Sequence, residues 1–250
     1  MIFPFTAQPA TFLERPNRYR IVAKLHNNDT LVHAHCPDPG RLRELLIPGA
    51  TVHLSRATNP ERKTAYDLRF VEHPEHGQLI SLDTRLPNQI FQEGLESGFF
   101  PQFTHFTHFR REVSLPHASP NQVNQNGVRS RFDFYLHDNV GAECWVEVKS
   151  ATLVIDRCAR FPDAVTERGR RHVLELAELT QQGTPTAIVF IVQRPDADQL
   201  QPQWDNDPAF AHALVAAHNA GVAIYAYTCI LTQRQVTLQR AISVNLTPQA

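Results

Sequence analysis

Two carboxylates and one lysine stand on neighbouring strand-like segments in the middle of the chain. Asp133 lies in the segment 131–135, and Glu147 and Lys149 follow in the segment 145–149. Side chains alternate along a strand, so Glu147 and Lys149 point to the same face, and a hairpin places Asp133 beside them. Burying such a set is costly unless a cation or a reaction requires it. These three residues are therefore the candidate catalytic group.

The chemistry that suits this group is metal-dependent hydrolysis of a phosphodiester. Mg²⁺ and Mn²⁺ are hard ions that prefer carboxylate oxygens, so Asp133 and Glu147 are expected to hold one or two of them. Such an ion polarises the phosphate and lowers the pKa of an attacking water. Lys149 would orient that water or offset negative charge on the phosphate. The alternative is a ladder of exposed salt bridges on an amphipathic strand.

Five motifs, in the same order along the chain, resemble those of the sugar fermentation stimulation protein A family. They are His35-Cys36-Pro37-Asp38-Pro39-Gly40-Arg41, Arg62-Lys63-Thr64-Ala65-Tyr66, Ser130-Arg131-Phe132-Asp133-Phe134, Val146-Glu147-Val148-Lys149-Ser150 and Phe161-Pro162-Asp163-Ala164-Val165-Thr166-Glu167-Arg168-Gly169. The resemblance covers nearly the whole chain. It implies DNA binding, an N-terminal oligonucleotide-binding (OB) barrel and a C-terminal restriction-endonuclease-like, PD-(D/E)XK domain.

The resemblance also implies roles for particular residues. Asp133, Glu147 and Lys149 match the nuclease core by position. Glu93 falls on the helix before the sheet, where such nucleases often place another carboxylate on the metal; it could equally be a solvated helix residue. The resemblance leaves open whether the chain cuts DNA or only holds it.

The order of the predicted helices and strands indicates two domains of different fold class, so that the chain as a whole is α+β/α/β. Residues 1–83 read as an OB-like β-barrel, because short strands are separated by turn residues. The expected strands are 20–26, 30–35, 51–56, 65–72 and 78–83, with a short helix over 41–46.

Residues 84–250 read as an α/β domain with a mixed sheet. Helices are expected at 88–97, 163–182 (with Asp163 as N-cap) and 207–220, and strands at 109–115, 130–137, 143–154, 186–192 and 222–227. The unbroken apolar run 186–192 is typical of a strand that is buried on both faces. The segment 116–127, rich in Pro, Asn, Gln and Ser, is expected to be a mobile loop.

Basic residues in both domains are candidates for contacts to the DNA backbone, which give affinity without sequence information. Arg168 and His172 are four residues apart and share one side of a helix, where they could hold a phosphate. Gly40 and Arg41 at a helix start would offer free amides to a phosphate. Ordinary surface charge is the alternative for all of them. The candidates are Lys24, Arg41, Arg43, Arg56, Arg62, Lys63, Tyr66, Arg131, Arg168, Arg171 and His172.

Composition limits these interpretations. The formal net charge is −1, so no overall basic field favours a nucleic acid. Four scattered cysteines and a start without a signal peptide predict a cytoplasmic protein that is not in a membrane, and the histidines lack the partner spacing of a zinc site. The preferred hypothesis is a nonspecific DNA-binding protein with a nuclease site. A non-catalytic regulatory factor of sugar (maltose) metabolism and an RNA-processing nuclease are the alternatives.

Overall fold

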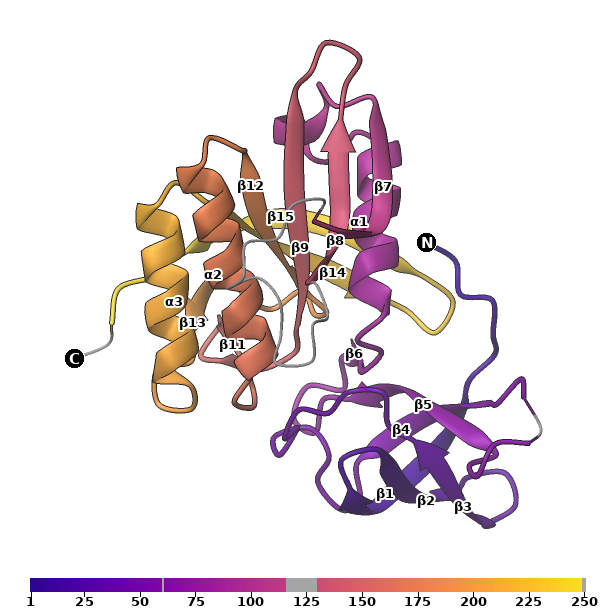
Figure 1. The fold of residues 1–250 in the computed structure, drawn as a ribbon. Helices are drawn as coiled ribbons and strands as arrows, with labels where there is room; N and C mark the ends of the chain where they lie inside the picture. The colour runs from indigo at the N-terminus through magenta and orange to yellow at the C-terminus, as the bar shows by residue number, and fades with distance from the viewer. Residues whose placement is uncertain (60, 116–129, 249–250) are drawn as a thin grey trace.

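The computed structural model describes residues 1–59, 61–115 and 130–248. The predicted two-domain architecture is confirmed: a small barrel lies below a larger sheet that carries helices on both faces (Figure 1). The predicted loop 116–127 lies outside the described residues. No helix in the described part of the chain is long and apolar enough to cross a membrane.

The first domain is a closed barrel followed by a short edge strand. Its sheet order is β3-β2-β1-β4-β5-β6, and a parallel pairing of β3 with β5 closes β1 to β5 into a barrel. The strands are β1 (Gln8–Asn17), β2 (Arg20–Leu25), β3 (Leu31–His35), β4 (Thr51–Arg56), β5 (Tyr66–Glu72) and β6 (Leu79–Ser81). Strand β1 is not among the predicted strands. Two register shifts, on either side of Glu14, break the alternation by which a strand is recognised.

The prediction of a helix over residues 41–46 is wrong. The amides of Leu45 and Leu46 both bond the carbonyl of Leu42, which makes a single turn. Leu42 has a positive φ of 51° and cannot continue a right-handed helix. All three leucines are buried in the barrel core, so core packing decides the conformation here rather than helix propensity.

The second domain is built on a nine-stranded mixed sheet with the order β10-β11-β13-β15-β14-β12-β9-β8-β7. The strands are β7 (His108–Ser114), β8 (Arg131–His137), β9 (Glu143–Ala151), β10 (Val154–Ile155), β11 (Cys158–Phe161), β12 (Thr186–Val192), β13 (Gln199–Pro202), β14 (Ala223–Leu231) and β15 (Val236–Val244). The helices are α1 (Leu86–Glu96), the short 3₁₀ helix η1 (Pro101–Phe103), α2 (Glu167–Gln181) and α3 (Pro208–Asn219).

Two hydrophobic cores lie on opposite faces of this sheet. Val189 and Ile191 of β12 point into the core under α1, whereas Ile188 and Phe190 point into the core under α2 and α3. The predicted double burial of this strand is therefore observed, since every residue of β12 is buried. The sheet thus carries helices on both sides, as Figure 1 shows.

Helix α2 begins later than predicted. Thr166 is its N-cap and accepts a hydrogen bond from the Gly169 amide at 3.0 Å, so Asp163 lies outside the helix. A Cβ on Gly169 would lie 2.7 Å from the Thr166 hydroxyl oxygen. Glycine at position 169 therefore lets the helix backbone approach its own N-cap, Thr166, closely.

The N-terminal segment connects the two domains. Ile2 forms an isolated bridge to Gln235, beside β15, and the Phe3 ring lies 5.1 Å from that of Phe70 in the barrel. The Phe5 ring lies under the Arg69 guanidinium at 4.3 Å. These contacts, together with the linker into α1, hold the barrel against the second sheet.

Candidate active site between the two domains

Asp133 is positioned by a break in the pairing of β8 with β9. The regular pairing ends at Phe134 and Val146, and beyond it the Asp133 Oδ2 accepts the Val148 amide at 2.8 Å. Its Oδ1 accepts the side-chain amide of Asn88 on α1, also at 2.8 Å. Burial, and then the nearby charge of Glu147, raise the pKa of Asp133 to about 6.

Glu147 points to the α2 side of β9 and is only 5% exposed. Its Oε1 accepts hydrogen bonds from the Lys149 ammonium and from His172 Nδ1, the latter at 2.7 Å. Burial alone would raise the pKa of Glu147, but the Lys149 charge and the contact with His172 outweigh it and lower the pKa to about 2. The carboxylate is thus held ionised inside the protein.

The second oxygen of Glu147 is left without a partner. Oε2 is buried and makes no hydrogen bond with any residue that the structure describes. An unsatisfied carboxylate oxygen in a buried place is costly and requires an explanation. A bound cation would satisfy it.

The structure therefore brings together Asp133, Glu147 and Lys149, but it does not add Glu93 to them. Glu93 Oε2 pairs with the N-terminal ammonium of Met1 at 2.7 Å, and its side chain is 52% exposed. Within residues 1–59, 61–115 and 130–248, no group of three or more His, Cys, Asp or Glu could hold a metal ion. α1 contributes Asn88 to the site instead, through its hydrogen bond to Asp133.

Two residues predicted to contact DNA are buried. His172 is 2% exposed, bonds Glu147 and lies against the Phe132 ring at 5.5 Å between centroids. Tyr66 is 6% exposed and belongs to the barrel core. Because both side chains are buried, neither is accessible to a nucleic acid. The sequence does not show this, since helical spacing and an aromatic residue type do not reveal which side of an element faces inward.

The remaining basic candidates lie at or near the surface, and several have acidic partners. Lys24 pairs with Asp29 at 2.8 Å and Arg62 with Asp67 at 2.9 Å. The other two ion pairs are Arg131–Glu112 and Arg171–Glu175, and Arg56 lies over the Tyr66 ring. The side chains of Arg41, Arg43, Lys63 and Arg168 are exposed.

The amides at Gly40 do not form the predicted phosphate site. The Gly40 amide donates to its neighbour Asp38 at 2.7 Å, and the Leu42 amide donates across the domain boundary to Asp163 Oδ2 at 2.8 Å. Arg15 fixes the same loop by donating to the carbonyls of Asp38, Gly40 and Arg41. The loop 38–42 is thus a structural clamp between the barrel and the second domain.

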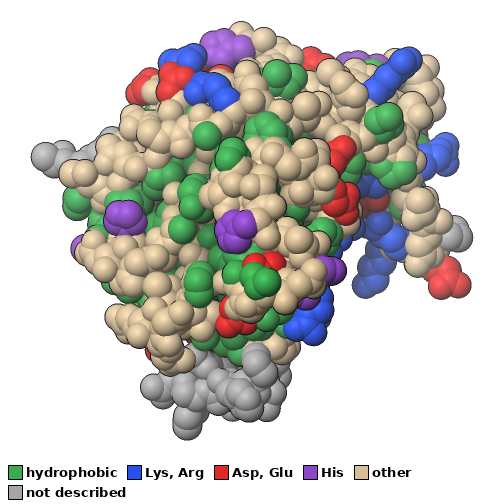
Figure 2. All heavy atoms as spheres, turned by 90° about the horizontal axis from the view of Figure 1, so that it is seen from above, with side chains coloured by type: hydrophobic (Ala, Val, Ile, Leu, Met, Phe, Trp, Pro, Cys, Tyr) green, Lys and Arg blue, Asp and Glu red, His purple; other side chains and the backbone are tan. Residues whose placement is uncertain are grey.

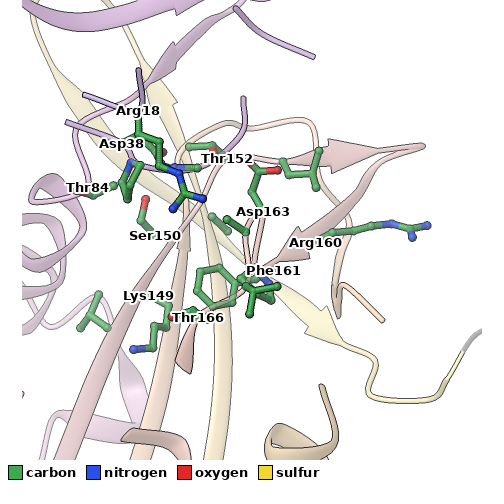
Figure 3. Close-up of a pocket in the computed structure, with 18 residues that line it drawn as sticks. Arg18, Asp38, Thr84, Lys149, Ser150, Thr152, Arg160, Phe161, Asp163 and Thr166 are labelled. Carbon is green, nitrogen blue, oxygen red and sulfur yellow. Dashed lines mark hydrogen bonds between the residues drawn. The ribbon is translucent and has the colours of Figure 1, made fainter. Parts of the chain in front are cut away.

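A pocket of about 290 Å³ lies between this clamp and strand β9. Figure 3 shows Lys149 at one end and Arg18, which reaches in from the barrel, at the other. Hydroxyl and carboxyl groups line the space between them. The polar lining residues include Asp38, Thr84, Ser150, Thr152, Asp163 and Thr166.

The face seen from above, which lies at the far end of the second sheet, differs in character from this pocket. Figure 2 shows mostly hydrophobic and uncharged side chains over the middle of that face, with some Asp, Glu and His among them and Lys and Arg side chains toward its margin. The middle of that face therefore offers no basic patch to a phosphate backbone.

Fold and site together define a class: an OB barrel joined to an α/β domain with a mixed sheet, with two carboxylates and a lysine at the domain boundary. The family model "SfsA N-terminal OB domain" matches residues 13–82, and "Sugar fermentation stimulation protein RE domain" matches residues 85–235. The chain belongs to the sugar fermentation stimulation protein (SfsA) family.

Relatives match over nearly the whole length. The chain is 43% identical to the sugar fermentation stimulation protein homolog of Moorella thermoacetica, over 95% of this chain and 96% of that protein. It is 36% identical to the homolog of Clostridium tetani, over 98% and 100%. The structure of Pyrococcus furiosus SfsA in complex with Ca²⁺ matches with a TM-score of 0.82 and 29% identity, over 98% of both chains.

Proposed function

We propose that this protein is a metal-dependent nuclease that contacts the phosphate backbone of DNA, and that Asp133 and Glu147 hold Mg²⁺ or Mn²⁺. The observation that carries the proposal is the buried Glu147 Oε2, which has no hydrogen-bond partner in the described structure although its neighbour Oε1 has two. A hydrogen-bonded salt bridge alone would leave this oxygen unsatisfied.

The donor set fits a hard divalent ion. Two carboxylates suit Mg²⁺ or Mn²⁺, because Mg²⁺ is usually bound by one or two carboxylates and keeps several waters. The solved relative from Pyrococcus furiosus contains Ca²⁺, another hard ion that prefers oxygen ligands. When bound, such an ion polarises the scissile phosphate and lowers the pKa of water.

The residues of this chain have separate roles in the proposed reaction. Asn88 and the Val148 amide orient Asp133, and His172 orients Glu147. Lys149 brings a positive charge to the pocket side of Glu147, where negative charge develops on the phosphate during attack.

The DNA partner is supported by the class of the two domains and by exposed basic side chains at the surface. Because the net charge is only −1, we expect modest affinity that depends strongly on salt. Phosphate contacts of this kind give little sequence preference.

The test is a cleavage assay on labelled DNA with Mn²⁺, Mg²⁺ or EDTA, comparing the wild type, Asp133→Asn and Asp205→Asn. Asp205 is exposed, so its variant is a matched control for the loss of one carboxylate. We expect cleavage by the wild type and Asp205→Asn, and none by Asp133→Asn or in EDTA.

Equal cleavage by the wild type and Asp133→Asn would reject the site. No cleavage by any of the three, with DNA binding intact, would favour the non-catalytic regulatory factor. Preferential cleavage of RNA in the same assay would favour the RNA-processing nuclease.

A further inference from the structure

The pocket between the barrel and strand β9 carries an inference that rests on the proposed function and specifies its substrate. We propose that this pocket accepts one unpaired nucleotide, so that the strand beside Lys149 is single-stranded DNA and Arg18 binds one of its phosphates.

The size of the pocket favours a single strand. A sphere of the same volume as the pocket, about 290 Å³, would be about 8 Å across. A duplex does not fit such a space, since the major groove of B-DNA alone is about 12 Å wide. One nucleotide with its base turned inward is a group of suitable size.

The walls of the pocket are fixed by contacts that join the two domains. Asp163 accepts the Leu42 amide at 2.8 Å, and Gln193 Nε2 donates to the Asp83 carbonyl at 3.3 Å. Buried Phe70 of the barrel belongs to the core that α1 completes. Widening the pocket enough to admit a duplex would break these contacts.

The pocket lining carries both cationic and carboxyl side chains. Arg18 and Lys149 lie toward its two ends, Asp163 lies toward the middle, and Asp38 lies beside Arg18 (Figure 3). Carboxylates repel phosphates but accept hydrogen bonds from the amino groups of bases. Phosphates are therefore expected at Arg18 and Lys149, and a base beside Asp163.

Arg18 is the side chain that this interpretation adds to the site. Its side chain is exposed, and no acidic group in the described residues forms an ion pair with it, unlike Lys24 or Arg62. Its guanidinium reaches toward Ser150 in Figure 3. An unpaired arginine in a polar pocket suits a phosphate oxygen pair, which its planar fork matches.

The test measures binding by fluorescence anisotropy in EDTA, so that no strand is cut and the result does not depend on catalysis. The probes are a labelled single-stranded oligo-dT and a blunt duplex of the same length. The variants are Arg18→Gln and the matched control Arg20→Gln, an exposed barrel arginine that does not line the pocket.

We expect the wild type to prefer the single strand and Arg18→Gln to bind it about tenfold more weakly, as for a lost charged hydrogen bond. The slope of log affinity against log salt should become shallower by about 0.7, the value for one phosphate of a single strand. Arg20→Gln should change neither quantity.

Equal or tighter binding of the blunt duplex would overturn the proposal, and so would an Arg18→Gln variant with wild-type affinity and slope. In Mn²⁺, a duplex with a single-stranded tail should be cut in the tail, and cleavage in the paired part would also count against it. Equal cleavage by the wild type and Asp133→Asn in Mn²⁺ would instead reject the proposed nuclease site, whatever the binding results are.

Discussion

His172 Nδ1 on helix α2 lies 2.7 Å from Glu147 Oε1 on strand β9, and both residues are buried. The histidine therefore orients a carboxylate that is proposed to hold the metal, although its position in the sequence suggests a phosphate contact. Groups behind a metal ligand commonly fix its orientation and raise its effectiveness.

Replacing His172 tests this positioning role. We expect His172→Phe to lower Mn²⁺ affinity and cleavage by about 10–100-fold, as for other partners of metal ligands. His172→Gln, whose amide can still donate to Glu147, should recover part of the loss. Titration calorimetry with Mn²⁺ measures affinity directly, and thermal unfolding of both variants serves as the control for folding. Unchanged Mn²⁺ affinity in a folded His172→Phe protein would contradict the role.

Lys149 should affect rate more than metal binding. Lys149→Ala is expected to keep Mn²⁺ binding but to lose most of the cleavage rate, since the ammonium acts on water and the developing charge rather than on the ion. Lys149→Arg should restore only part of the rate, because a planar fork cannot place its charge as a compact ammonium does. The comparison is between kcat and the Mn²⁺ dissociation constant, and a variant that loses both equally would argue against this division of roles.

Metal binding should depend on pH through Asp133. Its pKa is raised to about 6, so the metal-free protein carries a proton there below that pH, whereas Glu147 with a pKa of about 2 stays ionised. The proton must leave before the carboxylate can bind an ion, so Mn²⁺ affinity should rise with pH up to about 6 and level off above it.

The raised pKa of Asp133 also affects the stability of the metal-free protein, in the opposite direction. The unfolded carboxyl ionises near 3.8 and the folded one near 6, so the free energy of unfolding should fall as pH rises between these values. Thermal denaturation in EDTA and in Mn²⁺ across this range measures both effects. Asp133→Asn should remove both, and a wild-type pH profile in that variant would assign the titration to another group.

Gly40 tests the clamp between the domains. A Cβ at this position would lie 2.7 Å from Asp163 Oδ2 and 2.9 Å from Asp38 Oδ1, so Gly40→Ala should destabilise the protein by about 1–3 kcal/mol. In an Asp163→Ala background one of the two clashes disappears, and the penalty should shrink. A double-mutant cycle from urea unfolding measures this coupling, and strict additivity would show that the two residues act independently.

Much of the architecture could be predicted because it depends on local patterns. The alternation in the segment 145–149 predicts that Glu147 and Lys149 share a face, and the apolar run 186–192 predicts a strand buried on both sides, as the structure has them. The sequence does not reveal strand β15, since only two of its nine residues are buried and its apolar pattern is weak.

The partners of the site residues depend on contacts between distant parts of the chain. Leu42 and Asp163 are separated by 121 positions, and Asn88 and Asp133 by 45. No local pattern encodes such pairs, because their distance is set by how the sheet, helices and barrel pack.

The sequence by itself determined that Glu147 and Lys149 share one face of a strand, because side-chain alternation is a property of the strand. Only the tertiary structure decided that His172 turns inward to Glu147, that Glu93 pairs with the N-terminus, and that a pocket of about 290 Å³ lies between the barrel and strand β9. The physical reason is that burial and cavity shape arise from packing between elements, and packing energies are shared among residues that the chain brings together only when it folds.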